Sequence, residues 1–293
     1  MMELAFPSGG ALDAIGVQYW EPPEHLRYFF GSIYHFSVRL QNYSDVTRAD
    51  MPQLRFMLAA TGEYLFNDGR RCSTPEVCML GATMGATRFF IDGEASVLGI
   101  SVLPLGWLAL GCESADLWVD NLYDAEAVHG PQYRTMLAQL RAAPRLDDAI
   151  PLLWTFLEQQ LAPVPQSLID LVSKIDQWLS ENDSPRIEDI VEATGLSARQ
   201  LARYTNRLYG APPKFLARKY RALRCAAQIV LDKKTWNELC AEGCFYDQSH
   251  FIREIKQFLG LTPNQLLTDP TMLARLTVQR RALTGVMKLN RIS

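Results

Sequence analysis

The feature that most constrains the fold of this 293-residue chain is a pattern that repeats after fifty residues in its second half. Two runs recur with this offset: Leu201-x-Arg203 with Phe251-x-Arg253, and Gly210-x-x-Pro213-x-x-Leu216 with Gly260-x-x-Pro263-x-x-Leu266. Glycine favours the position that ends a helix, and proline favours the first turn of the next helix. The repeat therefore predicts two copies of one small helical unit.

A short helix and a tight turn precede the repeated run in each copy. These stretches are 187–193 with Thr194-Gly195-Leu196, and 236–242 with Gly243-Cys244-Phe245. The second helix of the first copy is predicted to start at a capping box formed by Ser197 and Gln200, and that of the second copy after Asp247. A short helix, a turn and a capped second helix are the helix-turn-helix pattern. We therefore predict two such units, at 186–209 and 235–259.

Helices are predicted throughout the second half of the chain, at 167–181, 186–193, 197–208, 213–231, 235–242, 248–258 and 263–268. The helix over 213–231 joins the two units, and its apolar residues recur every three or four positions, which gives one apolar stripe. Its 18–20 residues span about 27–30 Å. Successive major-groove segments on one face of DNA are about 34 Å apart, so this helix could hold two recognition helices one turn apart. An ordinary amphipathic helix in a bundle is the alternative.

The first half of the chain has a different character. Short aromatic or β-branched runs separated by Gly, Pro, Asn and Asp fill the first ~110 residues, at 28–38, 54–58, 87–91 and 95–103. Such runs predict an antiparallel barrel or sandwich. Helices are expected at 131–143 and 147–161, before a break at Pro163-Val164-Pro165. The predicted fold class is α+β with two domains: a β-rich regulatory, effector-sensing or dimerisation domain at 1–165 with appended helices, and an all-α DNA-binding domain at 166–293.

The two halves also differ in charge. Residues 1–166 contain 10 Arg, no Lys and 19 acidic residues, a net charge of −9, whereas 167–293 contain 19 basic and 13 acidic residues, a net charge of +6. A basic domain favours a polyanionic partner, with nucleic acid as the first candidate, although a solvated basic surface is the alternative. The tail at 270–293 is also basic and is expected to be helical. Without a signal peptide or an apolar run of membrane-spanning length, we expect a cytoplasmic protein whose six cysteines are reduced.

Residues 167–268 resemble the DNA-binding domain of the AraC/XylS family of bacterial transcription regulators. The matching stretches are IEDIVEATGLSARQLARYTNRLYGAPPKFLARKYRALRCAAQIVLD and WNELCAEGCFYDQSHFIREIKQFLGLTPNQLL. The resemblance implies a bipartite helix-turn-helix domain that binds promoter DNA, and RNA polymerase as a partner if the protein is an activator. In this family the turn before Phe245 usually has glycine, where this chain has Cys244. Either Cys244 takes the strained left-handed conformation or the turn is shifted and the neighbouring Gly243 takes it, and we favour Gly243.

The first ~150 residues resemble, more loosely, an effector-sensing domain found in some of these regulators. The residues that carry this likeness are Leu80-Gly81, Gly99-Ile100, Pro104-x-Gly106-Trp107 and Leu108. The likeness implies a small-molecule effector, and a homodimer is a further expectation. Aromatic residues of this half would either line a ligand pocket or fill the core, and we favour the core for most of them; they are Trp20, Phe29, Phe30, Tyr34, Phe36, Phe89, Phe90 and Trp107.

Six residues near the starts of the two recognition helices are candidates for DNA contact: Arg199, Arg203, Gln248, Ser249, His250 and Arg253. N-terminal residues of such helices meet base edges or phosphates. Arginine suits guanine or phosphate and glutamine suits adenine, and we favour phosphate for Arg203 and Arg253. The alternative is a solvated polar face. The apolar residues of the same units are expected in the core, and they are Leu196, Leu201, Phe245 and Phe251.

No catalytic residue, metal site or cofactor site is predicted. The four histidines are not spaced as metal ligands on one strand or helix, and neither a GxSxG motif nor a glycine-rich phosphate loop occurs. Cys240 and Cys244 could form a redox or metal pair, although free cysteines are more often small core residues. We therefore predict a sequence-specific transcription regulator that reads two adjacent major-groove segments under the control of its N-terminal domain. The alternative is an enzyme whose catalytic barrel is targeted to DNA by the helical domain.

Overall fold

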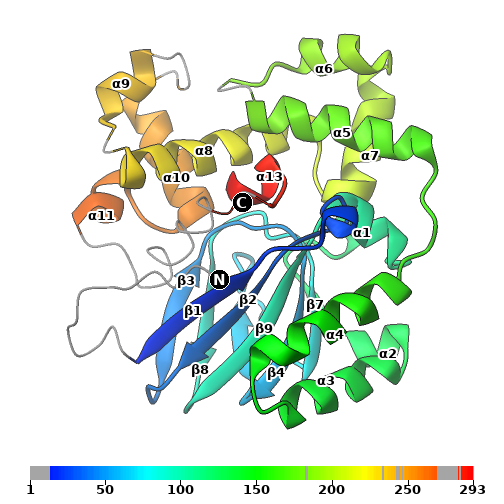
Figure 1. Cartoon of the computed structure of the whole chain (residues 1–293). Coiled ribbons are helices and arrows are strands. Elements are labelled where there is room, and N and C mark those ends of the chain that lie inside the picture. The colour runs from blue at the N-terminus through cyan, green and yellow to red at the C-terminus, as the bar shows by residue number, and fades with distance from the viewer. Residues whose placement is uncertain are drawn as a thin grey trace.

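The computed structural model describes residues 14–181, 184–232, 234–241, 245, 247–268, 283 and 285–292. A β-rich domain with four α-helices forms the first half of the chain, and the second half is all helical (Figure 1). This arrangement confirms the predicted α+β class with two domains. The expectations for Gly243 and Cys244, for the side chain of Cys240 and for most of the tail at 270–293 lie outside the described residues.

Two antiparallel sheets face each other in the N-terminal domain. The first has six strands in the order β1 (Ile15–Trp20), β2 (Phe30–Val38), β9 (Ala95–Val102), β4 (Gln53–Ala59), β7 (Val77–Leu80) and β10 (Leu122–Asp124). The second has four strands in the order β3 (Tyr43–Thr47), β8 (Thr87–Ile91), β5 (Gly62–Leu65) and β6 (Arg71–Ser73). Side chains from both sheets pack together in one apolar cluster, which includes Val38 and Met57 from the first and Phe89 from the second. The domain is therefore a β-sandwich, as the short alternating runs predict.

Helices α3 (Gln132–Ala142) and α4 (Leu146–Gln159) cover the outer face of the six-stranded sheet. The cluster between helices and sheet contains the fully buried Phe30, Leu54 and Ile100 together with Leu137 and Leu153. The helices predicted at 131–143 and 147–161 are confirmed to within two residues at each end. Several elements were not predicted, among them the strands β1, β3, β5, β6 and β7 and the short elements α1 (Pro104–Ala109), α2 (Ala125–His129) and β10.

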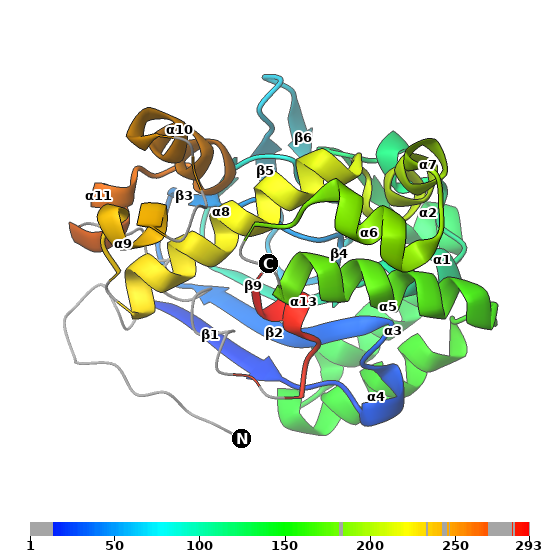
Figure 2. The ribbon, with the colours of Figure 1, turned by 90° about the horizontal axis from the view of Figure 1, so that it is seen from above.

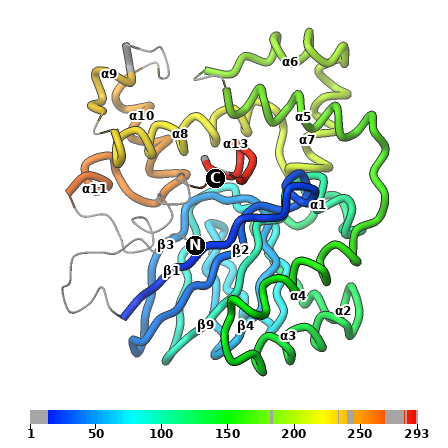
Figure 3. Tube along the Cα trace, in the orientation of Figure 1, coloured from blue at the N-terminus to red at the C-terminus, as the bar shows by residue number. Residues whose placement is uncertain are grey.

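The second half of the chain contains eight described helices. They are α5 (Gln166–Glu181), α6 (Ile187–Thr194), α7 (Ala198–Tyr209), α8 (Pro213–Leu231), α9 (Trp236–Ala241), α10 (Gln248–Leu259), α11 (Pro263–Thr268) and α13 (Lys288–Ile292). The seven helices predicted between 167 and 268 all form, with ends within one residue of the prediction. The segment between α4 and α5 runs along the outside of the molecule (Figure 3).

Local signals fix the ends of the two central helices of the repeat. Ser197 and Gln200 form the predicted capping box of α7, and the Asp247 carboxylate accepts a hydrogen bond from the backbone N–H of His250 at 2.7 Å. Gly210 and Gly260 end α7 and α10 in the left-handed region, with φ of 80° and 76°. A side chain with Cβ is strained in this region, so glycine is the residue that suits both ends.

The helical domain packs closely on the β-sandwich. The backbone carbonyl of Phe258, near the end of α10, accepts a hydrogen bond from Ala49 N at 2.7 Å, and that of Gln257 accepts one from Ala86 N at 2.9 Å. The end of α7 rests on the single-turn helix Ala115–Leu117 (η2), where Gly210 lies against Val119. Both recognition helices therefore contact the N-terminal domain at their C-terminal ends.

The short C-terminal helix α13 lies between the two domains (Figure 2). Leu289 and Asn290 are fully buried there, and a Cβ on Gly31 of β2 would overlap the Asn290 side chain. Lys288 Nζ forms an ion pair with Glu181 of α5 at 2.7 Å. The described end of the basic tail is thus helical as predicted, and it joins β2 to α5 and α8.

Candidate DNA-binding surface and effector pocket

The first helix-turn-helix unit consists of α6, the turn at Gly195 and α7. Gly195 takes φ of 67°, and no atom lies within 4 Å of the place of a Cβ. The fully buried Leu201 fixes the inner side of α7 in the core of the helical domain, as predicted. Arg199 and Arg203 are exposed on the outer side. The structure thus places both predicted DNA-contacting arginines of this unit in solvent near the start of the helix.

The second unit consists of α9, the turn that contains Phe245, and α10. The inner side of α10 carries Phe251, Ile255 and Phe258, which are all buried in one cluster with Phe245. On the outer side, the predicted residues Gln248, Ser249 and Arg253 are exposed. Three further residues share a shallow surface groove with Ser249 and Arg253, and they are Ile252, Lys256 and Gln257. Sequence reasoning missed these three, although their spacing of three and four residues from Ser249 and Arg253 indicates the same helix face.

His250 is placed differently from the other candidates. Its side chain is half-buried, and its ring lies 5.7 Å from the Phe245 ring, in an edge-on arrangement. Its Nε2 atom lies 3.8 Å from Oε1 of the buried Glu254. In this conformation the ring packs inside the unit, and DNA contact by His250 stays a prediction.

A buried carboxylate connects α10 to the linker helix α8. Glu254 is 2% exposed and accepts hydrogen bonds from Arg218 Nη2 at 2.5 Å and Arg218 Nε at 3.1 Å. These bonds raise the pKa of Arg218. A carboxylate held by two parallel N–H groups has little freedom to rotate. The second recognition helix is therefore held in a fixed orientation on α8, which crosses the molecule between α7 and α10 (Figure 2).

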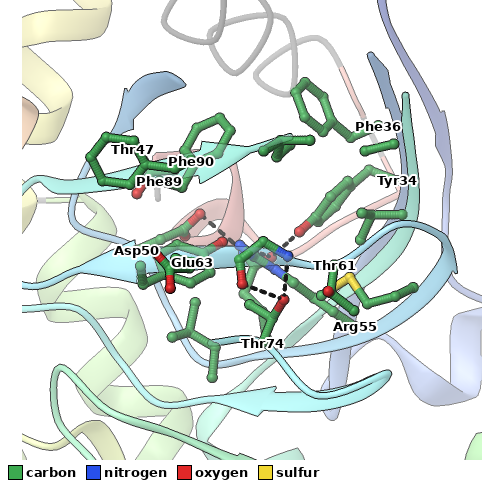
Figure 4. Close-up of a pocket in the computed structure, with 18 of the residues that line it drawn as sticks. Tyr34, Phe36, Thr47, Asp50, Arg55, Thr61, Glu63, Thr74, Phe89 and Phe90 are labelled. Atoms are coloured by element: carbon green, nitrogen blue, oxygen red, sulfur yellow. Dashed lines mark hydrogen bonds between the residues drawn. The ribbon is translucent and has the colours of Figure 1, made fainter. Parts of the chain in front are cut away.

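The N-terminal domain contains a cavity of about 110 Å³ between its two sheets (Figure 4). Of the eight aromatic residues considered from the sequence, four line this cavity: Tyr34, Phe36, Phe89 and Phe90. The other four belong to the core or pack against it, and they are Trp20, Phe29, Phe30 and Trp107. Phe36 and Phe89 also belong to the apolar cluster between the sheets, so the preference for the core holds for most of the eight residues.

Polar side chains meet at one side of the cavity. The Gln53 side-chain carbonyl accepts hydrogen bonds from Tyr34 Oη at 2.5 Å and from Arg55 Nη2 at 3.4 Å. The Gln53 amide group donates to the Asp50 carboxylate at 3.0 Å. Gln53 is only 2% exposed, so its hydrogen bonds are needed to offset its burial. A chain of hydrogen bonds therefore leads from Arg55 in the cavity to Asp50 at its edge.

Lys219 of the linker helix α8 reaches the other end of this chain. Its side chain is 2% exposed, and Nζ donates to the backbone carbonyls of Asp50 at 2.8 Å and Thr83 at 2.9 Å. Burial lowers the pKa of Lys219 to about 8, although Asp50 and Asp120 act in the opposite direction. Asp50 and Thr83 both line the cavity. The linker helix of the helical domain thus contacts the wall of the cavity directly.

The described residues also contain one contact between a cysteine and a histidine. Cys112 Sγ lies 4.0 Å from His129 Nε2, and Tyr123 Oη lies 3.0 Å from the same nitrogen. Burial raises the pKa of Cys112 to about 11. The thiol therefore keeps its proton at neutral pH and is not an activated nucleophile.

Within the part of the chain that the structure describes, no group of three His, Cys, Asp or Glu side chains could hold a metal ion. No described helix is both long enough and apolar enough to cross a membrane.

Residues 190–269 match the family model of the helix-turn-helix domain, in its AraC-type form. No curated protein gives a significant match to the chain. Among solved structures, ToxT from Vibrio cholerae with an unsaturated fatty acid bound is 10% identical, with a TM-score of 0.46 over 81% of this chain and 97% of that chain. The AraC-like transcriptional activator CuxR is 14% identical, with a TM-score of 0.34 over 74% and 83%. Likenesses with TM-scores below 0.5 assign no ligand or partner to this chain.

The domain match and the geometry agree on the same segment. The matched residues include both recognition helices, and each of these helices has a buried inner side and an exposed polar outer side. The segment lies in the half of the chain that carries a net charge of +6. The chain therefore carries an AraC-type helix-turn-helix domain at residues 190–269 and is a DNA-binding transcription regulator.

Proposed function

We propose that the protein reads two adjacent major-groove segments of promoter DNA with α7 and α10, under the control of a ligand in the cavity of the β-sandwich. The observation that supports this proposal best is the pair of capped helices with exposed polar outer sides, both attached to the 19-residue helix α8. Such a helix is about 28 Å long, close to the separation of successive major-groove segments.

The proposed contacts follow from side-chain type and position. Arg203 and Arg253 stand at equivalent places in the two units, and their charge suits phosphate oxygens. Gln248 lies at the first position of α10, where a side-chain amide can read an adenine edge. Arg199 and Ser249 complete the predicted set, and we add Lys256, which is exposed on the same face as Ser249 and Arg253. Because the two units have the same chain direction, the DNA site would be an asymmetric site or a direct repeat.

Control by the N-terminal domain is supported by its contacts with the reader. A ligand that displaces Arg55 or Gln53 would act on the hydrogen-bond chain that ends at Lys219 of α8. The carbonyl groups of Gln257 and Phe258 give a second connection, since loops of the β-sandwich bind the end of α10. The alternative of an enzyme targeted to DNA lacks a supporting observation, because the one Cys–His contact described involves a protonated thiol.

Fluorescence anisotropy with DNA from the protein's own upstream region tests the proposed contacts. Arg203→Ala and Arg253→Ala should each weaken binding to all sequences and reduce the slope of log affinity against log salt by about one. Gln248→Ala should instead relax the preference at one base pair and leave the salt slope unchanged. Unchanged binding in all three variants would contradict the assignment. Sedimentation of the same complexes would show whether the protein binds DNA as a dimer. If the regulator activates transcription, we expect RNA polymerase as its protein partner.

A further inference from the structure

Arg55 of β4 lines the cavity with its positive charge and has no counter-ion among the described residues. In the described part of the chain, its guanidinium has two contacts, with Gln53 Oε1 at 3.4 Å and with the Tyr64 ring, whose centroid lies 5.3 Å away. Its Nε atom is shielded from solvent and has no hydrogen-bond partner there. None of the described carboxylates lies within 4.0 Å of this guanidinium. Figure 4 shows Arg55 and Tyr34 on one side of the cavity and Phe89 and Phe90 on the other.

This environment is unusual for an arginine. Three arginines on the surface of the same domain are paired with carboxylates, and they are Arg70 with Asp68 at 2.5 Å, Arg71 with Glu63 at 3.3 Å and Arg141 with Glu76 at 2.7 Å. Removing a charge from water is unfavourable unless an opposite charge or a full set of acceptors replaces the water. A half-buried guanidinium that lines a cavity and has no carboxylate nearby therefore indicates an anionic ligand.

The carboxylates that line the cavity are already engaged. Asp50 accepts hydrogen bonds from Gln53 Nε2 and Met51 N, and Glu63 pairs with Arg71 outside the cavity. They therefore leave the positive charge of Arg55 uncompensated. The rest of the wall includes the hydroxyl side chains of Thr61 and Thr74 together with aromatic and aliphatic residues such as Phe36 and Val97.

We propose that the cavity binds a small organic carboxylate, whose head group pairs with Arg55 and whose apolar body lies among the aromatic side chains. A planar carboxylate can accept two parallel hydrogen bonds from a guanidinium. The volume of about 110 Å³ is below the roughly 150 Å³ of a cavity that holds benzene, so the body inside the cavity can be no larger than one such ring. This inference rests on the proposed function, because it names the class of effector for the same cavity.

Thermal unfolding of the full chain without ligand gives the first test. If Arg55 is an uncompensated charge that awaits a ligand, Arg55→Met should raise the melting temperature, by about 2–4 °C for a change of this kind. Arg71→Met is the matched control, because Arg71 also lies over an aromatic ring, at 4.9 Å from the Phe90 centroid, but has its ion pair with Glu63. This control should not raise the melting temperature. An Arg55→Met protein that melts below the wild type would overturn the proposal, since the guanidinium would then be structural.

Binding of defined probes gives the second test. Phenylacetate and hexanoate at millimolar concentration should raise the melting temperature of the wild type. Phenylacetamide and hexanamide should need at least tenfold higher concentrations to give the same rise. Arg55→Met should abolish the difference between acid and amide. Equal effects of acids and amides, or no effect of any carboxylate, would contradict the proposal. Arg203→Ala should keep the response to carboxylates and lose DNA affinity, so failure of the cavity proposal and failure of the DNA-binding proposal can be distinguished.

Discussion

Replacing Lys219 by methionine should change the way in which the stability of the protein depends on pH. Lys219 is buried between α8 and the β-sandwich, and its ammonium group donates to the carbonyls of Asp50 and Thr83. Methionine has a similar length and no charge, so the substitution removes the titrating group while keeping most of the buried apolar volume.

The size of the effect follows from the pKa of Lys219. The unfolded chain holds the proton up to the ordinary pKa of 10.5, whereas the folded chain releases it near pH 8 because of burial. Between these two values the unfolded state binds more protons, so the free energy of unfolding rises with pH. The difference between 10.5 and about 8 corresponds to about 3 kcal/mol in total. About 2 kcal/mol of it should be gained between pH 7 and 9.5.

The assay is urea unfolding followed by tryptophan fluorescence, at several values between pH 7 and 9.5. Subtracting the Lys219→Met curve from the wild-type curve removes the contributions of all other groups, and the difference should rise by about 2 kcal/mol over this range. Lys174→Met is the matched control, because Lys174 donates to the Ala193 carbonyl at 2.9 Å but is exposed. Its curve should run parallel to that of the wild type. A Lys219→Met curve that is also parallel would refute the argument that this ammonium is buried.

Further predictions concern the turns and the core of the helical domain. Gly195→Ala should cost about 1 kcal/mol of stability, because only the left-handed backbone opposes the new Cβ. Gly260→Ala should cost at least about 2 kcal/mol in the same urea assay, because its Cβ would also lie 2.6 Å from Val46; equal costs would contradict the packing of α10 on the β-sandwich. Burial raises the pKa of Asp176 to about 7, despite its hydrogen bond from Tyr209, so its folded form keeps a proton that the unfolded chain loses near 3.8. The free energy of unfolding should therefore fall as the pH rises from about 4 to 7, by up to about 4 kcal/mol from this group. Asp176→Asn should flatten the plot of stability against pH over this range.

The helical domain could be predicted closely from the sequence because its boundaries are set by local chemistry. The caps at Ser197 and Asp247 and the glycines at 210 and 260 act within one turn of the helix they start or end. The six candidate DNA contacts could be placed at the starts of α7 and α10 for the same reason. The direction of His250 could not, because its contact with Phe245 depends on how the turn packs against the helix.

The β-sandwich and the connection between the domains were harder to predict. Strand pairing joins residues far apart in the sequence, so the short runs indicate strands but do not indicate which sheet each one enters. Lys219 lies 136 residues from Thr83, and a lysine on an amphipathic helix is ordinarily expected in solvent. The burial of Leu289 in α13 and the cavity around Arg55 also arise from tertiary packing, which leaves no periodic signal in the sequence.

The most direct test of the central claim is hydroxyl-radical footprinting of the full chain on its upstream DNA. Two protected blocks should appear on one face of the duplex, with centres about 10 bp apart, because α7 and α10 would enter successive major-groove segments. Arg203→Ala should weaken protection mainly in one block and Arg253→Ala mainly in the other. A single protected block, or the loss of the same block in both variants, would contradict the claim that the two helices read DNA side by side.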